Sequence, residues 1–178
     1  MISKKIFFII FLQFSLFANS VYNINFLDFQ AKVFPKIILL DNNFEDKLLE
    51  NSVVLTILYE EIDYSVVESL KDKIEKEYKS LKDYNLKVNS LKYSEFNRNK
   101  LSTAYILLLE KDEKILEISK ILSSNSRLTF AYDNSYLDLG VIFGLSITSK
   151  VDILLNIEAL KNSKIELQNS IFSVVKIR

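Results

Sequence analysis

Two long stretches of the chain repeat apolar residues every three or four positions, which is the period of one face of an α-helix. The first stretch runs from Phe26 to Leu40 and predicts an N-terminal helix, which Pro35 should kink or divide. The second has its apolar stripe from Val66 to Leu81, and oppositely charged residues spaced four apart lie on the other side. Both stretches therefore predict amphipathic helices that bury one face.

Short runs of β-branched and aliphatic residues alternate with the helical stretches and have the length of strands. The run from Ser52 to Glu60 is apolar enough for a strand that is buried on both faces. Three further strands are predicted at Leu86–Tyr93, Ala104–Leu109 and Leu128–Tyr132, with a shorter helix at Glu113–Leu122. This alternation is typical of βαβ units, which form parallel sheets.

The last third of the chain has a different pattern. Two strands, Val141–Ile147 and Val151–Ile157, are joined by a tight connection and should pair antiparallel. Gly144 inside the first of them indicates a bulge or a close backbone approach. A helical turn at Glu158–Ser163 and a closing amphipathic helix at Gln168–Lys176 follow. We therefore predict one α/β domain, a three-layer sandwich with a mixed, largely parallel sheet and a C-terminal antiparallel hairpin.

The start of the chain has the three parts of a secretory signal peptide. Lys4 and Lys5 supply the positive charge, Ile6–Phe17 is apolar except at Gln13 and Ser15, and Ala18 is a small residue suited to cleavage. This apolar run is shorter than the roughly 20 residues that a spanning helix needs, which disfavours an uncleaved anchor. We predict a signal peptide at residues 1–18, cleaved after Ala18 or Ser20, and a soluble domain at residues 19–178 in the bacterial periplasm.

Composition excludes most of the chemistry that enzymes use. The chain has 23 basic and 23 acidic residues, a balance that gives no electrostatic footprint for nucleic acid. It contains no histidine and no cysteine, so the usual zinc, copper and haem ligands are missing, as are Ser-His and Cys-His nucleophiles. Two glycines are too few for a phosphate loop or a dinucleotide fingerprint. We predict that the protein is not an enzyme and has no catalytic residue, cofactor or metal.

Three weaker signals have ordinary structural explanations. The acidic stretches Asp41–Asp46 and Asp133–Asp138 could bind calcium, but they lack the glycine and distal glutamate of an EF-hand loop and are predicted to be turns. Ser102 with Lys100 could form a nucleophile pair, although serine and lysine are so common here that the match is close to chance. Eight tyrosines could line a ligand or partner surface, although such residues more often form the rim of a core: Tyr59, Tyr64, Tyr78, Tyr84, Tyr93, Tyr105, Tyr132 and Tyr136.

The stretch from Leu128 to Arg178 resembles the YfiR/HmsC-like family of small exported bacterial proteins. The resemblance rests on a strand, a short acidic turn, Gly140 before a hairpin, Asn156 before a short helix, a single strand and a terminal helix. In this chain the last two elements correspond to Ile165–Leu167 and Ile171–Val175. Upstream, Phe29–Leu40 and Ser102–Lys111 are similar in placement to the family's first helix and to the strand before its central helix. The cysteines that some members use for disulfides are absent, so the resemblance carries over no redox sensing.

This resemblance implies a periplasmic regulator that binds and restrains an inner-membrane signalling protein, most often a diguanylate cyclase with HAMP and GGDEF domains, or acts beside a sensor kinase. The alternative is a periplasmic small-molecule binding module associated with an outer-membrane receptor or a sensor kinase, with its pocket at the carboxyl ends of the strands. Both functions can coexist because a sensor needs an input. The oligomeric state is not specified by any residue pattern and stays unknown at this point.

Overall fold

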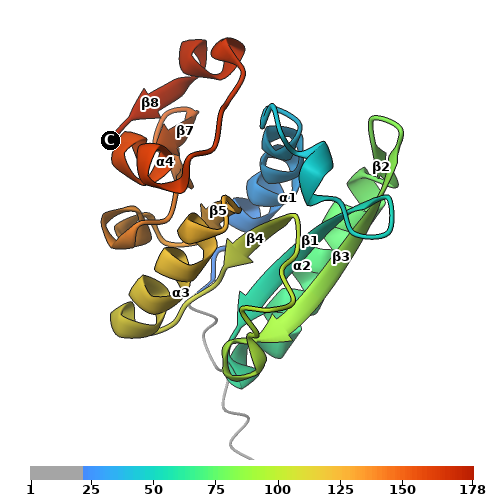
Figure 1. The fold of residues 1–178 in the computed structure, drawn as a ribbon. Helices are drawn as coiled ribbons and strands as arrows, with labels where there is room; N and C mark the ends of the chain where they lie inside the picture. The colour runs from blue at the N-terminus through green and yellow to red at the C-terminus, as the bar shows by residue number, and fades with distance from the viewer. Residues whose placement is uncertain (1–21) are drawn as a thin grey trace, which may run out of the picture.

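The computed structural model describes residues 22–178 (Figure 1), so the signal peptide predicted at residues 1–18 lies outside the described residues. One sheet of eight strands, in the order β2-β3-β1-β4-β5-β6-β7-β8, runs through this part of the chain. Its parallel centre consists of β1 (Ser52–Tyr59), β3 (Tyr84–Lys92), β4 (Ala104–Leu107), β5 (Leu128–Ala131) and β6 (Phe143–Ile147).

Three short strands complete the sheet. β2 (Ser80–Leu81) pairs antiparallel with β3 at one edge, and β7 (Val151–Leu155) pairs antiparallel with β6. β8 (Val175–Ile177) pairs parallel with β7 at the other edge. The predicted C-terminal hairpin is confirmed by this β6–β7 pairing.

Helices cover both faces of the sheet. α1 (Ile24–Ile38) and α2 (Tyr64–Glu77) pack against each other on one face, whereas α3 (Asp112–Ser124) lies over the other face with α4 (Ile157–Ser163) beside it (Figure 1). The predicted α/β fold, a three-layer sandwich with a mixed, largely parallel sheet, is therefore confirmed. No helix within residues 22–178 is long and apolar enough to cross a membrane.

The burial of the elements explains why these residues form this fold. All eight residues of β1 are buried, as expected for a central strand with a helical layer on each side. α1 turns its apolar stripe to the sheet, where Phe34 stacks on Phe130 with ring centroids 4.6 Å apart. α1 is continuous through Pro35, so the division that was predicted as the alternative to a kink is wrong. Pro35 lies in the last turn, where its missing N–H removes one intrahelical bond and only three helical residues follow it.

Two predicted helices end differently in the structure. The helix expected up to Leu81 stops at Glu77, because Ser80 and Leu81 form β2 and pair with the start of β3. The closing helix expected at Gln168–Lys176 is wrong. Asn169–Ser173 is a 3-10 helix, and the β-branched residues after it form β8 on the open edge of β7. Backbone pairing at that edge, together with β-branched side chains, outweighs the helical spacing of the apolar residues.

The two closing elements of the family resemblance change in the same way. Ile165–Leu167 makes one isolated bridge, between Leu167 and Asp41, and does not form a strand of the sheet. Ile171–Val175 is divided between the 3-10 helix and β8. The chain therefore has the elements of this C-terminal pattern as far as α4, but not the single strand and terminal helix that should follow.

Candidate binding groove

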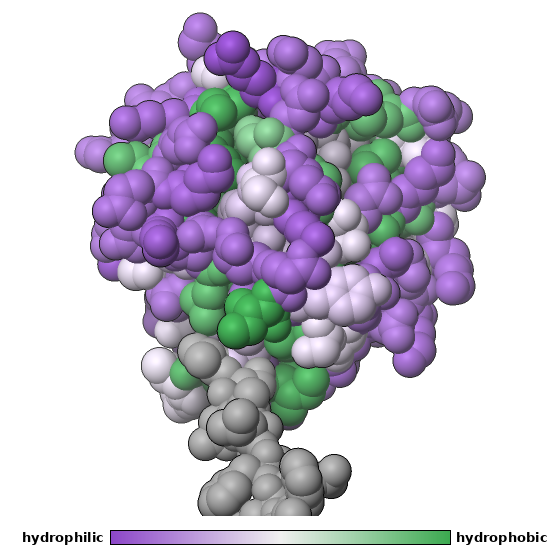
Figure 2. All heavy atoms as spheres, turned by 90° about the horizontal axis from the view of Figure 1, so that it is seen from below, coloured by the Kyte–Doolittle hydropathy of each residue, from purple (hydrophilic) through white to green (hydrophobic). Residues whose placement is uncertain are grey.

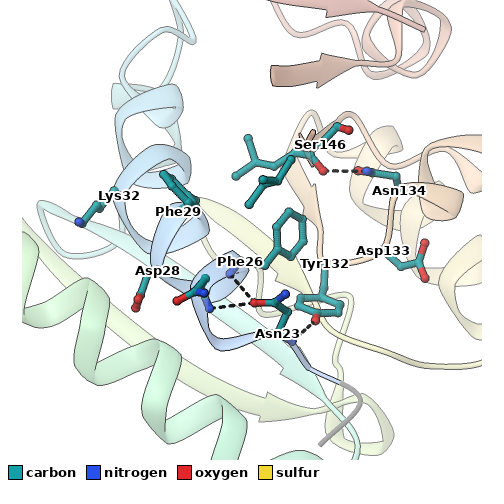
Figure 3. A pocket seen from close by; sticks show the side chains of 12 residues that line it. Asn23, Phe26, Asp28, Phe29, Lys32, Tyr132, Asp133, Asn134 and Ser146 are labelled. Atoms are coloured by element: carbon teal, nitrogen blue, oxygen red, sulfur yellow. Dashed lines mark hydrogen bonds between the residues drawn. The ribbon is translucent and has the colours of Figure 1, made fainter. Parts of the chain in front are cut away.

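A groove of about 890 Å³ lies between α1 and the carboxyl ends of β5 and β6 (Figure 3). Its walls come from three segments that are far apart in the sequence. The lining residues are Asn23, Asn25, Phe26, Asp28, Phe29 and Lys32 from the start of α1, Tyr132, Asp133 and Asn134 after β5, and Leu145, Ser146 and Ile147 from β6.

Tyr132 holds the first wall in place. Its hydroxyl oxygen accepts a hydrogen bond from the backbone N–H of Asn23 at 2.7 Å, and its ring packs on Tyr22 and Phe26 with centroid distances of 4.6 and 5.3 Å. The Asn23 side chain in turn caps α1 by accepting from the N–H groups of Asn25 and Phe26 (Figure 3). The start of α1 is thus fixed relative to the end of β5.

Asn134 and Gly144 fix the opposite wall. The Asn134 side-chain amide donates to the carbonyl of Leu145 at 2.7 Å (Figure 3). A Cβ atom on Gly144 would lie 2.5 Å from the Asn134 side-chain oxygen, so the missing Cβ makes room for the Asn134 side chain in the 3-10 helix Asn134–Leu139. The atoms nearest to such a Cβ belong to the side chains of Asn134 and Leu137, so what approaches Gly144 closely is side chain and not the backbone approach that was predicted.

The groove presents apolar rings and alkyl groups with polar groups around them. Phe29 and Ile147 are 39% and 43% exposed, which leaves large apolar surfaces open to solvent inside the groove. The Asp28 carboxylate pairs with Lys73 of α2. Burial raises the pKa of Tyr132 from its usual value of 10, so this hydroxyl stays protonated at neutral pH. The arrangement suits binding of an amphipathic surface.

A second notable location is the switch point of the sheet, between the carboxyl ends of β1 and β4, where open α/β sheets commonly bind ligands. Here three tyrosine hydroxyls hold the loop after β4. Tyr93 donates to the carbonyl of Leu108 at 2.7 Å. The N–H groups of Leu109 and Glu110 donate to the hydroxyl oxygens of Tyr22 and Tyr136 at 3.0 and 2.7 Å. Tyrosine side chains therefore occupy the switch point, and the 890 Å³ groove lies beside it, at β5 and β6.

Carboxyl groups gather next to these tyrosines. A hydrogen bond shared with Glu110 raises the pKa of Glu60, and partial burial adds to the effect. Burial also raises the pKa of Asp63, although the hydrogen bond from Tyr22, 2.7 Å long, opposes that shift.

Figure 2 views the molecule from the side toward which the parallel strands point. Hydrophilic residues cover most of this face, and hydrophobic residues show between them in several places, including its lower part.

The residues singled out from the sequence have structural roles. Asp41 is buried and pairs with Lys47, and its carboxylate accepts from the N–H of Asn43 at 3.0 Å, as in an ordinary turn. The Ser102 hydroxyl lies 2.6 Å from that of Thr56, and no described hydrogen bond joins it to Lys100. Within residues 22–178, no group of three or more acidic side chains is placed to hold a metal ion.

The eight tyrosines divide between the core and its rim. Five are buried, namely Tyr59, Tyr93, Tyr105, Tyr132 and Tyr136, whereas Tyr64 is 53% exposed. Only Tyr132 among the eight lines the groove. Neither Phe29 nor Ile147 could be identified as a groove residue from the sequence, because a groove between elements distant in sequence leaves no local signal in either of them.

No protein-family model matches this chain, and no curated protein matches it significantly. Two solved structures are similar in fold. One is a conserved domain protein from Vibrio cholerae O1 biovar El Tor, with a TM-score of 0.57 and 12% identity over 85% of this chain. The other is an ABC domain in complex with L-Trp from Streptococcus pneumonia, with a TM-score of 0.51 and 10% identity over 80% of this chain. This chain spans 59% and 62% of the two proteins, and at these identities the likeness concerns the fold alone.

Proposed function

We propose that this protein is an exported regulatory domain that binds and restrains an inner-membrane signalling protein, with a diguanylate cyclase as the first candidate and a sensor kinase as the second. The groove between α1 and β6 is the proposed contact surface. The observation that carries the proposal is the pair of half-exposed apolar side chains, Phe29 and Ile147, on the lining of a groove that is otherwise held rigid by Tyr132 and Asn134.

The physical argument starts from the cost of exposing apolar surface. Large apolar side chains that stay open to water in one concave place commonly mark an interaction site. Phe29 and Ile147 come from different layers of the fold, so a partner segment lying in the groove would touch both. Aromatic and aliphatic anchors of this kind contribute much of the affinity of protein interfaces, and a preformed groove reduces the entropy lost on binding.

Two further observations support the proposal, namely the amino-acid composition and the contacts made by the first residues of the domain. The absence of histidine and cysteine supports action by binding and not by turnover. Tyr22 and Asn23 are already anchored in the fold, through Asp63 and Tyr132. Cleavage after Ala18 or Ser20 would leave both anchors in the mature domain. The resemblance of the C-terminal stretch to the YfiR/HmsC-like family supports a periplasmic regulator as the class of protein.

A small-molecule binding module is the second candidate, and the groove volume favours it. Ligand pockets commonly enclose 300–1,000 Å³, a range that includes the 890 Å³ found here. The structural neighbour from Streptococcus pneumonia is described in complex with L-Trp, a small molecule. Such pockets bury most of their ligand, however, whereas Phe29 and Ile147 line an open groove and stay exposed to solvent. Binding of a protein segment therefore fits the groove better.

Deletion and complementation test the proposal. A strain lacking the protein should contain more cyclic di-GMP than its parent, and wild-type protein should restore the parental level. Phe29→Ala should fail to restore it while the protein accumulates normally. Leu116→Ala is the matched control, because Leu116 is 37% exposed on α3, on the opposite face of the sheet. Unchanged cyclic di-GMP in the deletion strain would contradict regulation of a cyclase and favour a sensor kinase or a small ligand.

A further inference from the structure

One face of the sheet lacks a helix where the fold usually has one. The connection from β3 to β4 crosses the sheet as a short 3-10 helix, Tyr93–Glu95, followed by a loop that ends at Thr103 (Figure 1). A helix in this connection would cover β1 and β3 on the side of α3. The missing cover is visible in β3, where Lys87 and Asn89 are exposed, although their partners in β1, Val54 and Thr56, are buried.

A hollow of about 590 Å³ lies at this uncovered place. Its wall includes Leu49, Val54 and Leu91, so part of it is apolar. The polar part consists mainly of hydrogen-bond donors: three lysines, Lys71, Lys87 and Lys100, together with the amide of Asn89 and several hydroxyl groups.

The lysines outnumber the carboxylates in the hollow. Glu50 is the one acidic residue of the lining, and it pairs with Lys87 at 3.3 Å. This pair is exposed to solvent, with side-chain exposures of 50% for Lys87 and 86% for Glu50, so an incoming anion can displace it at little cost. None of the ion pairs described within residues 22–178 involves Lys71 or Lys100, and their charges are available to a ligand.

A buried hydroxyl pair at the floor of the hollow adds a directed donor. Thr56 interrupts the aliphatic run of β1, and its hydroxyl lies 2.6 Å from that of Ser102, with both side chains buried. The Ser102 side chain also shares a hydrogen bond with the side chain of Tyr105, so three hydroxyl groups with three protons are joined by two bonds. When Tyr105 donates to Ser102 and Ser102 donates to Thr56, the proton of Thr56, which lines the hollow, is left for an acceptor.

We propose that this hollow binds a small anion, either a carboxylate or a phosphate, whose charge lies between Lys87 and Lys100 and whose oxygen accepts from the Thr56–Ser102 hydroxyl pair. The apolar wall favours an organic anion with a short hydrocarbon part. The hollow lies on the face of the sheet opposite α1, and binding of an anion there is independent of the function proposed for the groove.

The test is a titration of the folded mature domain, labelled with nitrogen-15, with inorganic phosphate and separately with succinate, at constant ionic strength kept with sodium chloride. We expect saturable shifts of backbone amide signals in residues 54–56, 87–91 and 100–103. Saturation by phosphate alone identifies a phosphate site, and saturation by succinate alone identifies a carboxylate site. Shifts that do not saturate with either probe in the millimolar range, or that equal those caused by sodium chloride, would overturn the proposal.

Two substitutions should change the affinity in opposite directions. Lys100→Gln removes a charged donor and should weaken binding about tenfold, whereas Glu50→Gln removes the competing carboxylate and should strengthen it. Lys161→Gln, an exposed position on α4 outside the hollow, is the control and should leave the affinity unchanged. Equal affinities of Lys100→Gln and the wild type would place the anion elsewhere and overturn the assignment.

Discussion

The backbone N–H of Asn23 donates to the hydroxyl oxygen of Tyr132 at 2.7 Å, although the two residues are 109 positions apart in the chain. This bond joins the first turn of α1 to the carboxyl end of β5, and both of these segments line the groove. The shape of the groove therefore depends on a contact between the beginning and the last third of the described chain. Substitution of Tyr132 therefore tests both the geometry of the groove and the stability of the fold.

Tyr132→Phe should destabilise the domain by about 1 kcal/mol, since it leaves the Asn23 N–H without its acceptor but keeps the aromatic contacts of the ring. The free energy of unfolding, measured by urea titration with circular dichroism, gives the cost directly. Tyr64→Phe is the control, because Tyr64 is exposed and should change stability by less than about 0.5 kcal/mol. Equal losses in the two variants would show that the Asn23–Tyr132 bond contributes nothing.

Gly144→Ala should cost about 1–3 kcal/mol, because the new methyl group would be 2.5 Å from the side-chain oxygen of Asn134. In an Asn134→Ala background the same substitution should cost less, since the obstructing amide is gone. A double-mutant cycle on urea unfolding should therefore give a coupling energy of at least about 0.5 kcal/mol. Strictly additive effects would mean that the two residues do not determine each other's position.

Most of the fold could be predicted from local patterns. The continuous apolar run of β1 and the period of α1 each predicted their element closely, because burial on two faces or on one face leaves a distinct spacing in the sequence. The C-terminal end could not be predicted in this way. Ile171, Val175 and their neighbours fit a helical period, but the unpaired edge of β7 decided their conformation, and that edge exists only once the sheet has formed.

The candidate groove was harder to predict from the sequence than the fold. Tyr132 was noted as an aromatic residue of either the core or a partner surface, and it proved to be a buried residue that also lines the groove. Phe29 belongs to an ordinary amphipathic helix, and Ile147 to an ordinary strand. Their proximity to one groove depends on how α1 packs beside β6, which no spacing within either segment encodes. The absence of histidine and cysteine, in contrast, could be read directly from composition.

The carboxyl groups at the switch point predict a pH dependence of stability. The pKa of Glu60 is raised above its ordinary value of 4.5, so the folded state binds more protons than the unfolded state between the two pKa values. Stability therefore falls as the pH rises through this window. Glu60→Gln removes the penalty, and this variant should be more stable than the wild type at neutral pH, with the difference vanishing below pH 4.5.

The measurement is the difference between the urea midpoints of the two proteins, taken from neutral pH to the acid limit of folding. Groups distant from Glu60 titrate alike in both proteins, so their contributions cancel in this difference. Glu113→Gln, an exposed position at the start of α3, gives the background for the same change of side chain. A constant difference between Glu60→Gln and the wild type at every pH would contradict a raised pKa at Glu60.

The proposed export of the protein leads to a prediction about its mature end. Protein isolated from the periplasmic fraction should begin at Asn19 or Val21, so that Tyr22 keeps its bonds to Asp63 and to the N–H of Leu109, 2.7 and 3.0 Å long. Intact-mass measurement of the native protein identifies the first residue. A mass that includes Met1 would contradict the predicted signal peptide.

Site-specific photo-crosslinking in living cells tests the central claim most directly. A photoreactive residue at position 29, inside the groove, is compared with one at position 116, which has similar exposure on the opposite face. The account predicts that position 29 captures an inner-membrane protein with a cytoplasmic signalling domain, such as a diguanylate cyclase, and that position 116 does not. Capture of the same proteins from both positions, or of no membrane protein from position 29, would contradict it.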